Sequence, residues 1–289
     1  MTLSQTFFLS AGEVNAEGQL SLPLLTAKII DIATAHANSL GIGNPAMADS
    51  GCGWVLSRLT IEMLDYPRVN DTYTLTTWIE DWNRHFSTRC FRIDDENGTP
   101  LGYARSIWMV MNTQTRDNAG LSHLHLPEEA VAPLPCPIPR QARHTTIPAE
   151  LIDRGYTFRY TDIDFYRHVN TVRYVNLLLN CFTLDEMDTH SIRRLELSFL
   201  HEGHYGHTVE IRRRIVPTPE AEPIPAKDKD IAAAEKIKAN EEKIKADAEN
   251  GKDDAEKCKD NYSERNEFLI HDPDLDRDLL YARIILLSP

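Results

Sequence analysis

One long apolar helix pattern followed by several strand patterns occurs twice along this chain. The first helix pattern covers residues 24–40, where apolar side chains share one helical face and Gly41 and Gly43 end the pattern. The second covers residues 169–182. A helix and an antiparallel sheet can each bury one apolar face against the other. The order therefore predicts an α+β protein of two tandem halves, each a helix on an antiparallel β-sheet, and indicates an internal structural duplication.

Strand patterns fill the rest of each half. Period-two alternation bounded by turn residues is the signal of a half-buried strand. In the first half it predicts two short strands within residues 6–22 and further strands at 54–64, 72–82, 85–94 and 101–112. In the second half it predicts strands at 156–160, 194–201, 208–216, 267–270 and 279–287.

A proline-rich stretch separates the two halves. Six prolines lie between residues 127 and 149, a density typical of an extended linker rather than of a packed element. The length of 289 residues suits about two domains. We therefore predict an N-terminal domain at 1–126, a linker at 127–149 and a C-terminal domain at 150–289.

Residues 217–265 differ in composition from the rest of the chain. Nine of the ten lysines lie there, and the run Glu-Lys-Ile-Lys-Ala occurs twice, beginning at Glu235 and at Glu242. Large apolar residues are too few to make a packed face. We predict an insertion that is a solvated, partly helical or disordered excursion between two strands. The alternative is a partner-binding helix or a short coiled coil, which needs more sustained heptads.

Charge and composition exclude several classes of function. The formal charge of −13 argues against general nucleic-acid binding, which depends on basic surfaces. No apolar run approaches the roughly 20 residues that span a bilayer, and the N-terminus lacks the features of a signal peptide. The five cysteines are scattered, which fits reduced thiols and predicts a cytoplasmic protein. Glycine-rich phosphate loops and dinucleotide fingerprints are absent from the sequence.

The most chemically suggestive stretch is residues 160–174. Asp162, Asp164 and His168 lie within seven residues, immediately before the second helix pattern. Helix N-termini carry unpaired N–H groups and positive potential. A carboxylate, an imidazole and free N–H groups gathered at one place can activate water and hold an oxyanion.

Motifs in both halves resemble those of a known enzyme family. The pattern that begins at Tyr160, Y-x-D-x-D-x-x-x-H-V-N followed by an apolar helix, resembles the hot-dog fold thioesterases. The whole chain apart from the insertion is similar to the acyl-ACP thioesterases, a double hot-dog family of plants and bacteria. The first-half motifs that match are Gly53-Trp-Val-Leu-Ser-Arg-Leu59, Tyr66-Pro67, Asp71, Thr77-Trp78, Ala104-Arg-Ser-Ile-Trp-Met-Val-Met-Asn112 and Thr115-Arg116.

The resemblance implies a fold, a reaction and partners. It implies two tandem hot-dog domains, the first holding the acyl chain in an apolar tunnel and the second supplying the chemistry. The implied reaction is hydrolysis of a fatty acyl thioester on acyl carrier protein, without a cofactor. An acyl-CoA thioesterase and a non-catalytic acyl-binding homologue remain alternative functions. A homodimer is left open as the assembly.

Asp164 is the expected reacting carboxylate. By its chemistry it can attack the thioester carbonyl or activate a water as general base, and the resemblance places the family's essential aspartate here. From spacing alone, Asp162 and Asp164 could equally be caps of the following helix. We expect Asp162 to be a cap or a turn residue, and Asn170 to be a structural residue at the helix start first and a site residue second.

The resemblance adds three more candidate residues. His168 matches the catalytic histidine, and the unperturbed histidine pKa of about 6.5 suits proton transfer near neutrality, although a histidine bonded to backbone at the helix start is the alternative. Glu202 matches a catalytic glutamate, with an exposed turn carboxylate as the alternative, and Gly203 stands where a cysteine is often found. Tyr166 occupies the position of the family's asparagine, and a phenol cannot reproduce the short reach of an amide.

Two further expectations concern ligands. His201, His204 and His207 form an H-x-x-H-x-x-H pattern, but the intervening glycines favour a turn over a metal site, so no metal is predicted. Acyl carrier protein is acidic, so docking to this acidic chain calls for a local basic patch. The candidate patches are Arg193, Arg194, Arg212, Arg213 and Arg214, or Arg140 and Arg143.

Overall fold

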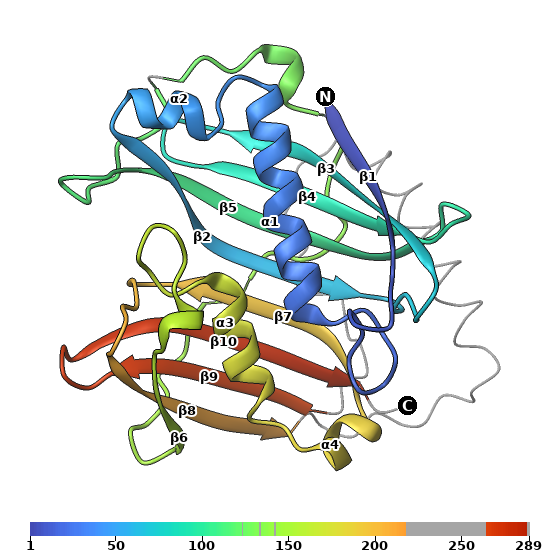
Figure 1. The fold of residues 1–289 in the computed structure, drawn as a ribbon, viewed down its shortest axis with the longest axis vertical. Coiled ribbons are helices and arrows are strands. Elements are labelled where there is room, and N and C mark those ends of the chain that lie inside the picture. Colours follow the sequence, from blue (N-terminus) through green and yellow to red (C-terminus); the bar gives the residue numbers. More distant parts are fainter. Residues whose placement is uncertain (123, 133, 142, 218–263, 288–289) are drawn as a thin grey trace.

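Ten strands form one antiparallel sheet, and the two main helices lie on the same face of it (Figure 1). The computed structural model describes residues 1–122, 124–132, 134–141, 143–217 and 264–287. The strand order is β1-β3-β4-β5-β2-β7-β10-β9-β8-β6. The strands are β1 (Thr2–Phe8), β2 (Cys52–Met63), β3 (Thr72–Trp82), β4 (Ser87–Asp94), β5 (Pro100–Asn112), β6 (Ile152–Thr157), β7 (Ser191–Phe199), β8 (Thr208–Pro217), β9 (Glu264–Asp272) and β10 (Arg277–Leu287). The helices are α1 (Leu22–Ser39), α2 (Asn44–Asp49), α3 (Thr171–Leu179) and α4 (Leu184–Asp188), with 3-10 turns η1 (Glu128–Ala130) and η2 (Tyr160–Asp162). The predicted α+β class is confirmed.

Each main helix buries the apolar face that the sequence pattern predicted. Leu25, Ile29 and Ile32 of α1 are fully buried against the sheet. In α3, Val175 and Leu178 are fully buried, and Asn170 caps the helix by accepting a hydrogen bond from the N–H of Val172 at 2.8 Å. The structural role expected of Asn170 is confirmed. The second helix is shorter than the predicted 169–182, because the chain turns after Leu179 and starts α4 with a new capping box.

The first strands predicted in each half are placed differently by the structure. The strand predicted at 156–160 is β6, four residues earlier at its start, and residues 160–162 form the turn η2 instead. Residues 6–22 contain the end of β1, isolated bridges from Val14 to Leu20 and from Gln19 to Arg68, and the first residue of α1. Most of the predicted insertion, residues 218–263, lies outside the described residues, and β8 and β9 pair as far as Pro217 and Glu264.

The two halves share one sheet and one core. Strand β2 of the first half pairs with β7 of the second, with Leu59 opposite Leu197 and Glu62 opposite Arg194. Edge strands present unpaired backbone groups, and this pairing removes one such edge from each half. The apolar side chains under α1 and α3 therefore belong to one continuous core.

The proline-rich segment 127–149 runs behind the sheet, on the face away from the helices (Figure 1). Its described residues form no helix or strand apart from η1, and they are packed against the sheet, contrary to the expectation of a linker rather than a packed element. Its backbone carbonyls accept hydrogen bonds from sheet side chains: Trp78 Nε1 donates to Leu134 at 2.6 Å, and Arg105 Nη1 donates to Ile138 at 2.7 Å. An extended segment has no internal hydrogen bonds, so these donors supply partners that it would otherwise lack.

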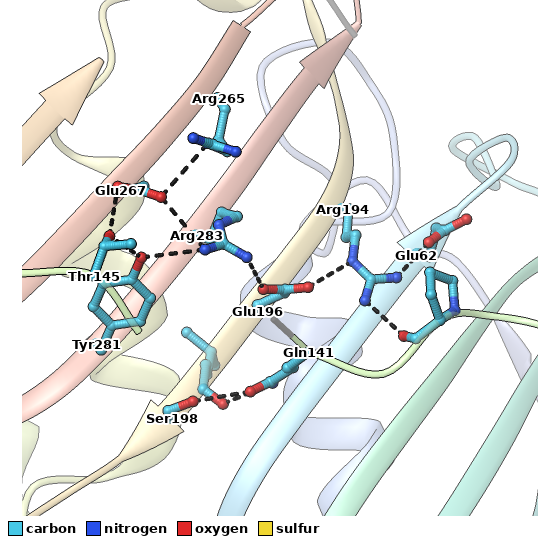
Figure 2. A network of polar contacts seen from close by, with 12 residues as sticks. Glu62, Gln141, Thr145, Arg194, Glu196, Ser198, Arg265, Glu267, Tyr281 and Arg283 are labelled. Carbon is cyan, nitrogen blue, oxygen red and sulfur yellow. Dashed lines mark hydrogen bonds and ion pairs between the residues drawn. The ribbon is translucent and has the colours of Figure 1, made fainter. Parts of the chain in front are cut away.

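Behind the junction of the two halves lies a buried network of charged side chains, shown in Figure 2. Alternate residues of a strand face opposite ways, so Leu195 and Leu197 enter the core while Arg194 and Glu196 face the linker. Arg194 bonds Glu196 at 2.8 Å and Glu62 of β2 at 2.5 Å. Glu196 also bonds Arg283 of β10 at 2.9 Å. The ion pairs thus tie three adjacent strands together across the junction.

Removing the central carboxylate should destabilise the whole protein. In Glu196→Gln, two buried guanidinium groups lose their shared anion, so we expect the free energy of unfolding in urea to fall by about 3 kcal/mol. Glu210→Gln is the matched control, because Glu210 is partly exposed and its pair with Arg212 should contribute less than about 1 kcal/mol. Equal losses in the two variants would contradict a special role for the buried network.

Two negative features of the described residues complete the fold. Within the described ranges, no helix is both long and apolar enough to cross a membrane. The cysteines that the structure describes, Cys52, Cys90, Cys136 and Cys181, are free thiols.

Candidate active site

The segment before α3 is a compact loop built on two aspartates with different roles. Asp162 is 6% exposed, and its Oδ2 accepts hydrogen bonds from the N–H of Arg159 at 2.7 Å and from the Tyr156 hydroxyl at 2.9 Å. Both bonds hold η2 in place. Asp162 is therefore a turn residue, one of the two structural roles expected of it, while the cap of the following helix is Asn170.

Asp164 closes the next turn and remains partly exposed. Its Oδ1 accepts hydrogen bonds from the N–H groups of Tyr166 at 2.9 Å and His168 at 3.1 Å, while its own N–H donates to the His168 carbonyl at 2.8 Å. The turn is tight enough to place Arg167 at a φ of 69°. These bonds fix His168 relative to the Asp164 carboxylate.

His168 meets Glu202, which reaches the site from the segment after β7. His168 Nε2 lies 3.3 Å from Glu202 Oε2, and Glu202 Oε1 forms an ion pair with Arg116. Arg116 lies in the turn after β5, so the first half of the chain contributes a side chain to this cluster. Arg277 Nη2 also donates to the Glu202 carbonyl at 3.1 Å. All four predicted site residues thus lie on two adjoining loops, with His168 and Glu202 in direct contact.

Two further histidines extend the cluster. The rings of His168 and His204 are 5.1 Å apart, and those of His204 and His207 are 5.5 Å apart. His207 Nδ1 lies 3.0 Å from the buried carboxylate of Asp272. The result is a row of imidazoles running from Glu202 to Asp272.

The electrostatics favour a neutral His168 at pH 7. Burial lowers the pKa of His168, and His204 and Arg116 lower that pKa further, while Asp164 partly opposes them. Burial and His207 likewise lower the pKa of His204. A neutral imidazole beside carboxylates can accept a proton from water and be stabilised once it is charged.

The predicted histidine pattern does not form one metal site. His201 Nδ1 contacts the Asp278 carbonyl at 2.7 Å and His207 is turned to Asp272, so only His204 faces His168. His168, Glu202 and His204 do present ligand atoms within 4.8 Å of one another. The Arg116 guanidinium already forms an ion pair with Glu202, however, and its positive charge opposes the binding of a cation there.

The sequence was compared with family models and known proteins. Residues 1–128 match the model of the acyl-ACP thioesterase N-terminal domain, and residues 147–262 match that of the C-terminal domain. The chain belongs to the acyl-ACP thioesterase family.

It is 25% identical over 235 residues to a chloroplastic acyl-[acyl-carrier-protein] hydrolase of Cuphea viscosissima, covering 77% of this chain and 57% of that protein. A palmitoyl-acyl carrier protein thioesterase of Gossypium hirsutum is 24% identical over 220 residues, covering 70% of this chain and 52% of that protein. The chain thus spans about half the length of these curated relatives.

Solved acyl-ACP thioesterases share the fold. The structure from Bacteroides thetaiotaomicron superposes with a TM-score of 0.76 at 23% identity, covering 99% of this chain and 97% of that one. The 12:0-ACP thioesterase from Umbellularia californica gives a TM-score of 0.74 at 17% identity, covering 100% and 94% of the two chains. The expected architecture of two tandem hot-dog domains is confirmed.

At two positions this acyl-ACP thioesterase family member departs from the pattern its sequence resembles. The Tyr166 ring lies against Phe165, with centroids 3.9 Å apart and planes tilted by 38°, and its phenol has no hydrogen bond to any described residue. It does not enter the cluster where the family's asparagine was expected to act.

At Gly203, a Cβ atom would lie 2.6 Å from Tyr174 Oη and 2.9 Å from Val169 Cγ2. The neighbouring side chains therefore leave no room for a cysteine at this position.

Sequence reasoning missed Arg116 and His204 as members of the site. Thr115-Arg116 was recognised only as a motif match, and its distance from residue 168 along the chain hid the contact with Glu202. His204 was considered only as a metal ligand. Arg116 could have been identified from the sequence because it lies in a matching motif but outside every predicted helix and strand.

Proposed function

We propose that this protein hydrolyses fatty acyl thioesters of acyl carrier protein and releases the free fatty acid. The observation that carries the proposal is the contact of His168 with Glu202 on the loop closed by Asp164. This arrangement gathers a neutral base and two carboxylates in a member of the acyl-ACP thioesterase family. The named activities of the curated relatives support the same reaction.

The proposed chemistry begins with His168 as general base. Neutral His168 takes a proton from water, and the water oxygen adds to the thioester carbonyl carbon. Glu202 and Asp164 stabilise the imidazolium that forms. When the C–S bond breaks, the same proton passes to the departing sulfur, leaving a carboxylic acid and the thiol of the carrier. Direct attack of Asp164 on the carbonyl is the competing route, and it differs by forming a covalent anhydride that hydroxylamine traps.

The oxyanion of the tetrahedral intermediate requires a donor near the start of α3. The N–H groups of residues 168–170 and of Val172 already donate to oxygen atoms within the protein. This leaves the N–H of Thr171, the first residue of α3, as the proposed donor.

The structure changes the choice of a docking patch for the carrier protein. Arg193, Arg194, Arg212, Arg213 and Arg214 all form ion pairs with carboxylates of this chain. Because these ion pairs compensate their charge, we do not propose the five arginines as the docking patch. Arg140 and Arg143 are exposed and have no ion pair with a described carboxylate, so they are the proposed contacts for an acidic carrier.

The decisive test is single-turnover hydrolysis of a panel of acyl carrier protein thioesters and the matching CoA thioesters. We expect turnover with the carrier-protein thioesters, and faster than with CoA. Equal rates would favour an acyl-CoA thioesterase. Tight acyl binding without turnover, together with activity in Tyr166→Asn, would identify a binding protein disabled at Tyr166.

A further inference from the structure

A recess in the N-terminal half lies between the C-terminal part of α1 and the strands β2 to β5. The space between its walls, open solvent included, is about 420 Å³, and three tryptophans line it: Trp54, Trp82 and Trp108. Ala33 and Ala37 of α1 line it too, and their small side chains help to leave the space open. Most of the lining is apolar, with Thr34, Asn44 and Ser87 as its neutral polar members.

One charged side chain breaks this apolar lining. Arg89 of β4 lines the recess, is 5% exposed, and faces the same side of the sheet as the core residue Phe91. Its Nη1 contacts His36 Nδ1 at 2.6 Å and Thr77 Oγ1 at 3.4 Å. Neither partner carries a negative charge.

Arg89 differs in this respect from the other buried arginines. Arg194 and Arg283 each bond buried carboxylates, and Arg105 pairs with Glu80 at 2.9 Å. Among the side chains that the structure describes, no carboxylate forms an ion pair with Arg89. Burial lowers the pKa of Arg89 to about 10, so the guanidinium is still charged at pH 7.

His36 cannot supply the missing negative charge. Arginine only donates hydrogen bonds, so Nδ1 of His36 is the acceptor and its proton lies on Nε2. Burial and Arg89 lower the pKa of His36 to about 4, which keeps the ring neutral. Its Nε2 is fully enclosed and has no hydrogen-bond partner among the described residues. The pair therefore has donors in excess and no compensating anion.

Burying a guanidinium without a counterion costs free energy. A ligand in the recess lowers that cost only if it supplies a hydrogen-bond acceptor, preferably a charged one. An alkyl end beside Arg89 would strip away its remaining solvent and give no hydrogen bond in return. A carboxylate would accept charge-assisted hydrogen bonds from the guanidinium, in a geometry that arginine suits especially well.

We propose that this recess receives the far end of the acyl group, and that Arg89 selects chains ending in a carboxylate over chains ending in a methyl group. The inference rests on the proposed hydrolysis for its biological meaning. The recognition itself depends only on the recess and Arg89, so it can be measured without any turnover.

The first experiment is equilibrium binding followed by tryptophan fluorescence, since three of the four tryptophans line the recess. The probes are the monomethyl and dimethyl esters of one α,ω-dicarboxylic acid, which differ only in a single carboxylate. We expect the monoester to bind wild-type protein at least about tenfold more tightly, and Arg89→Met to lose that preference. Arg92→Met is the control, because Arg92 lies on the same strand but is exposed and paired with Asp94.

The second experiment compares hydrolysis of carrier-protein thioesters of equal length that end in a methyl or a carboxylate group. Arg89→Met should gain activity on the methyl-ended chain, and a gain cannot arise from misfolding. Equal binding of the two esters by wild-type protein, or a preference that survives Arg89→Met, would overturn the inference. If no thioester is hydrolysed but the ester preference holds, the proposed reaction fails and the carboxylate site stands.

Discussion

Asp164→Asn should slow single-turnover hydrolysis of acyl carrier protein thioesters by about a thousandfold. The amide oxygen of asparagine can still accept the hydrogen bonds from the N–H groups of Tyr166 and His168, so the turn is preserved. What disappears is the negative charge beside His168. The measurement is the rate at saturating enzyme, with circular dichroism and urea unfolding to show that the fold is intact.

Asp162→Asn is the matched control for Asp164→Asn. Asp162 is two residues away but buried. Its Oδ2 accepts hydrogen bonds from Arg159 and Tyr156 and none from His168. We expect this change to cost about 1 kcal/mol of stability and to leave the chemical step nearly unchanged. The assignment of Asp164 fails if its asparagine variant works at close to the wild-type rate.

His168→Gln should cause a loss of similar size, about a hundredfold to ten-thousandfold, because the proton carrier is removed. In the wild-type protein the active form of His168 is the neutral one. Its pKa is lowered by burial, His204 and Arg116, so kcat/KM should be flat near pH 7 and fall below a midpoint under 6.5. The measurement is the pH profile of kcat/KM for wild-type protein and its disappearance in the variant.

Arg116→Gln separates a catalytic role of His168 from a structural one. Arg116 is one of the positive groups that lower the pKa of His168, so its removal should move the midpoint of the profile to higher pH. A merely structural histidine would leave the midpoint unchanged. A midpoint that stays fixed, or a wild-type rate that falls as pH rises through 7, would exclude His168 as the base.

The parts of the fold that sequence predicted well are those governed by local periodicity. Strand β3 occupies the predicted residues 72–82, and α1 begins and ends within two residues of its prediction. Alternation and helical periodicity record which side of an element is buried, and they do so within a few residues. They do not record which strand pairs with which. The β2–β7 pairing, which makes one sheet of two predicted ones, therefore could not be foreseen.

The same limit explains what was missed in the site. Asp164 and His168 are close in sequence, and their turn is visible there as a pattern. Glu202 came from a family resemblance, and Arg116 reaches it only because the two halves join edge to edge. The packed character of the linker was also invisible, because proline density reports an extended backbone but not the hydrogen bonds that its carbonyls accept.

The crowding at Gly203 limits the evolutionary paths open to this protein. A cysteine introduced there first would collide with the Tyr174 hydroxyl, which lies 2.6 Å from the position of its Cβ. A smaller residue at position 174 would have to arise first, at the expense of a well-packed core. The order of substitutions is therefore constrained, and a lineage that reaches this glycine–tyrosine pair cannot readily acquire a thiol nucleophile at position 203.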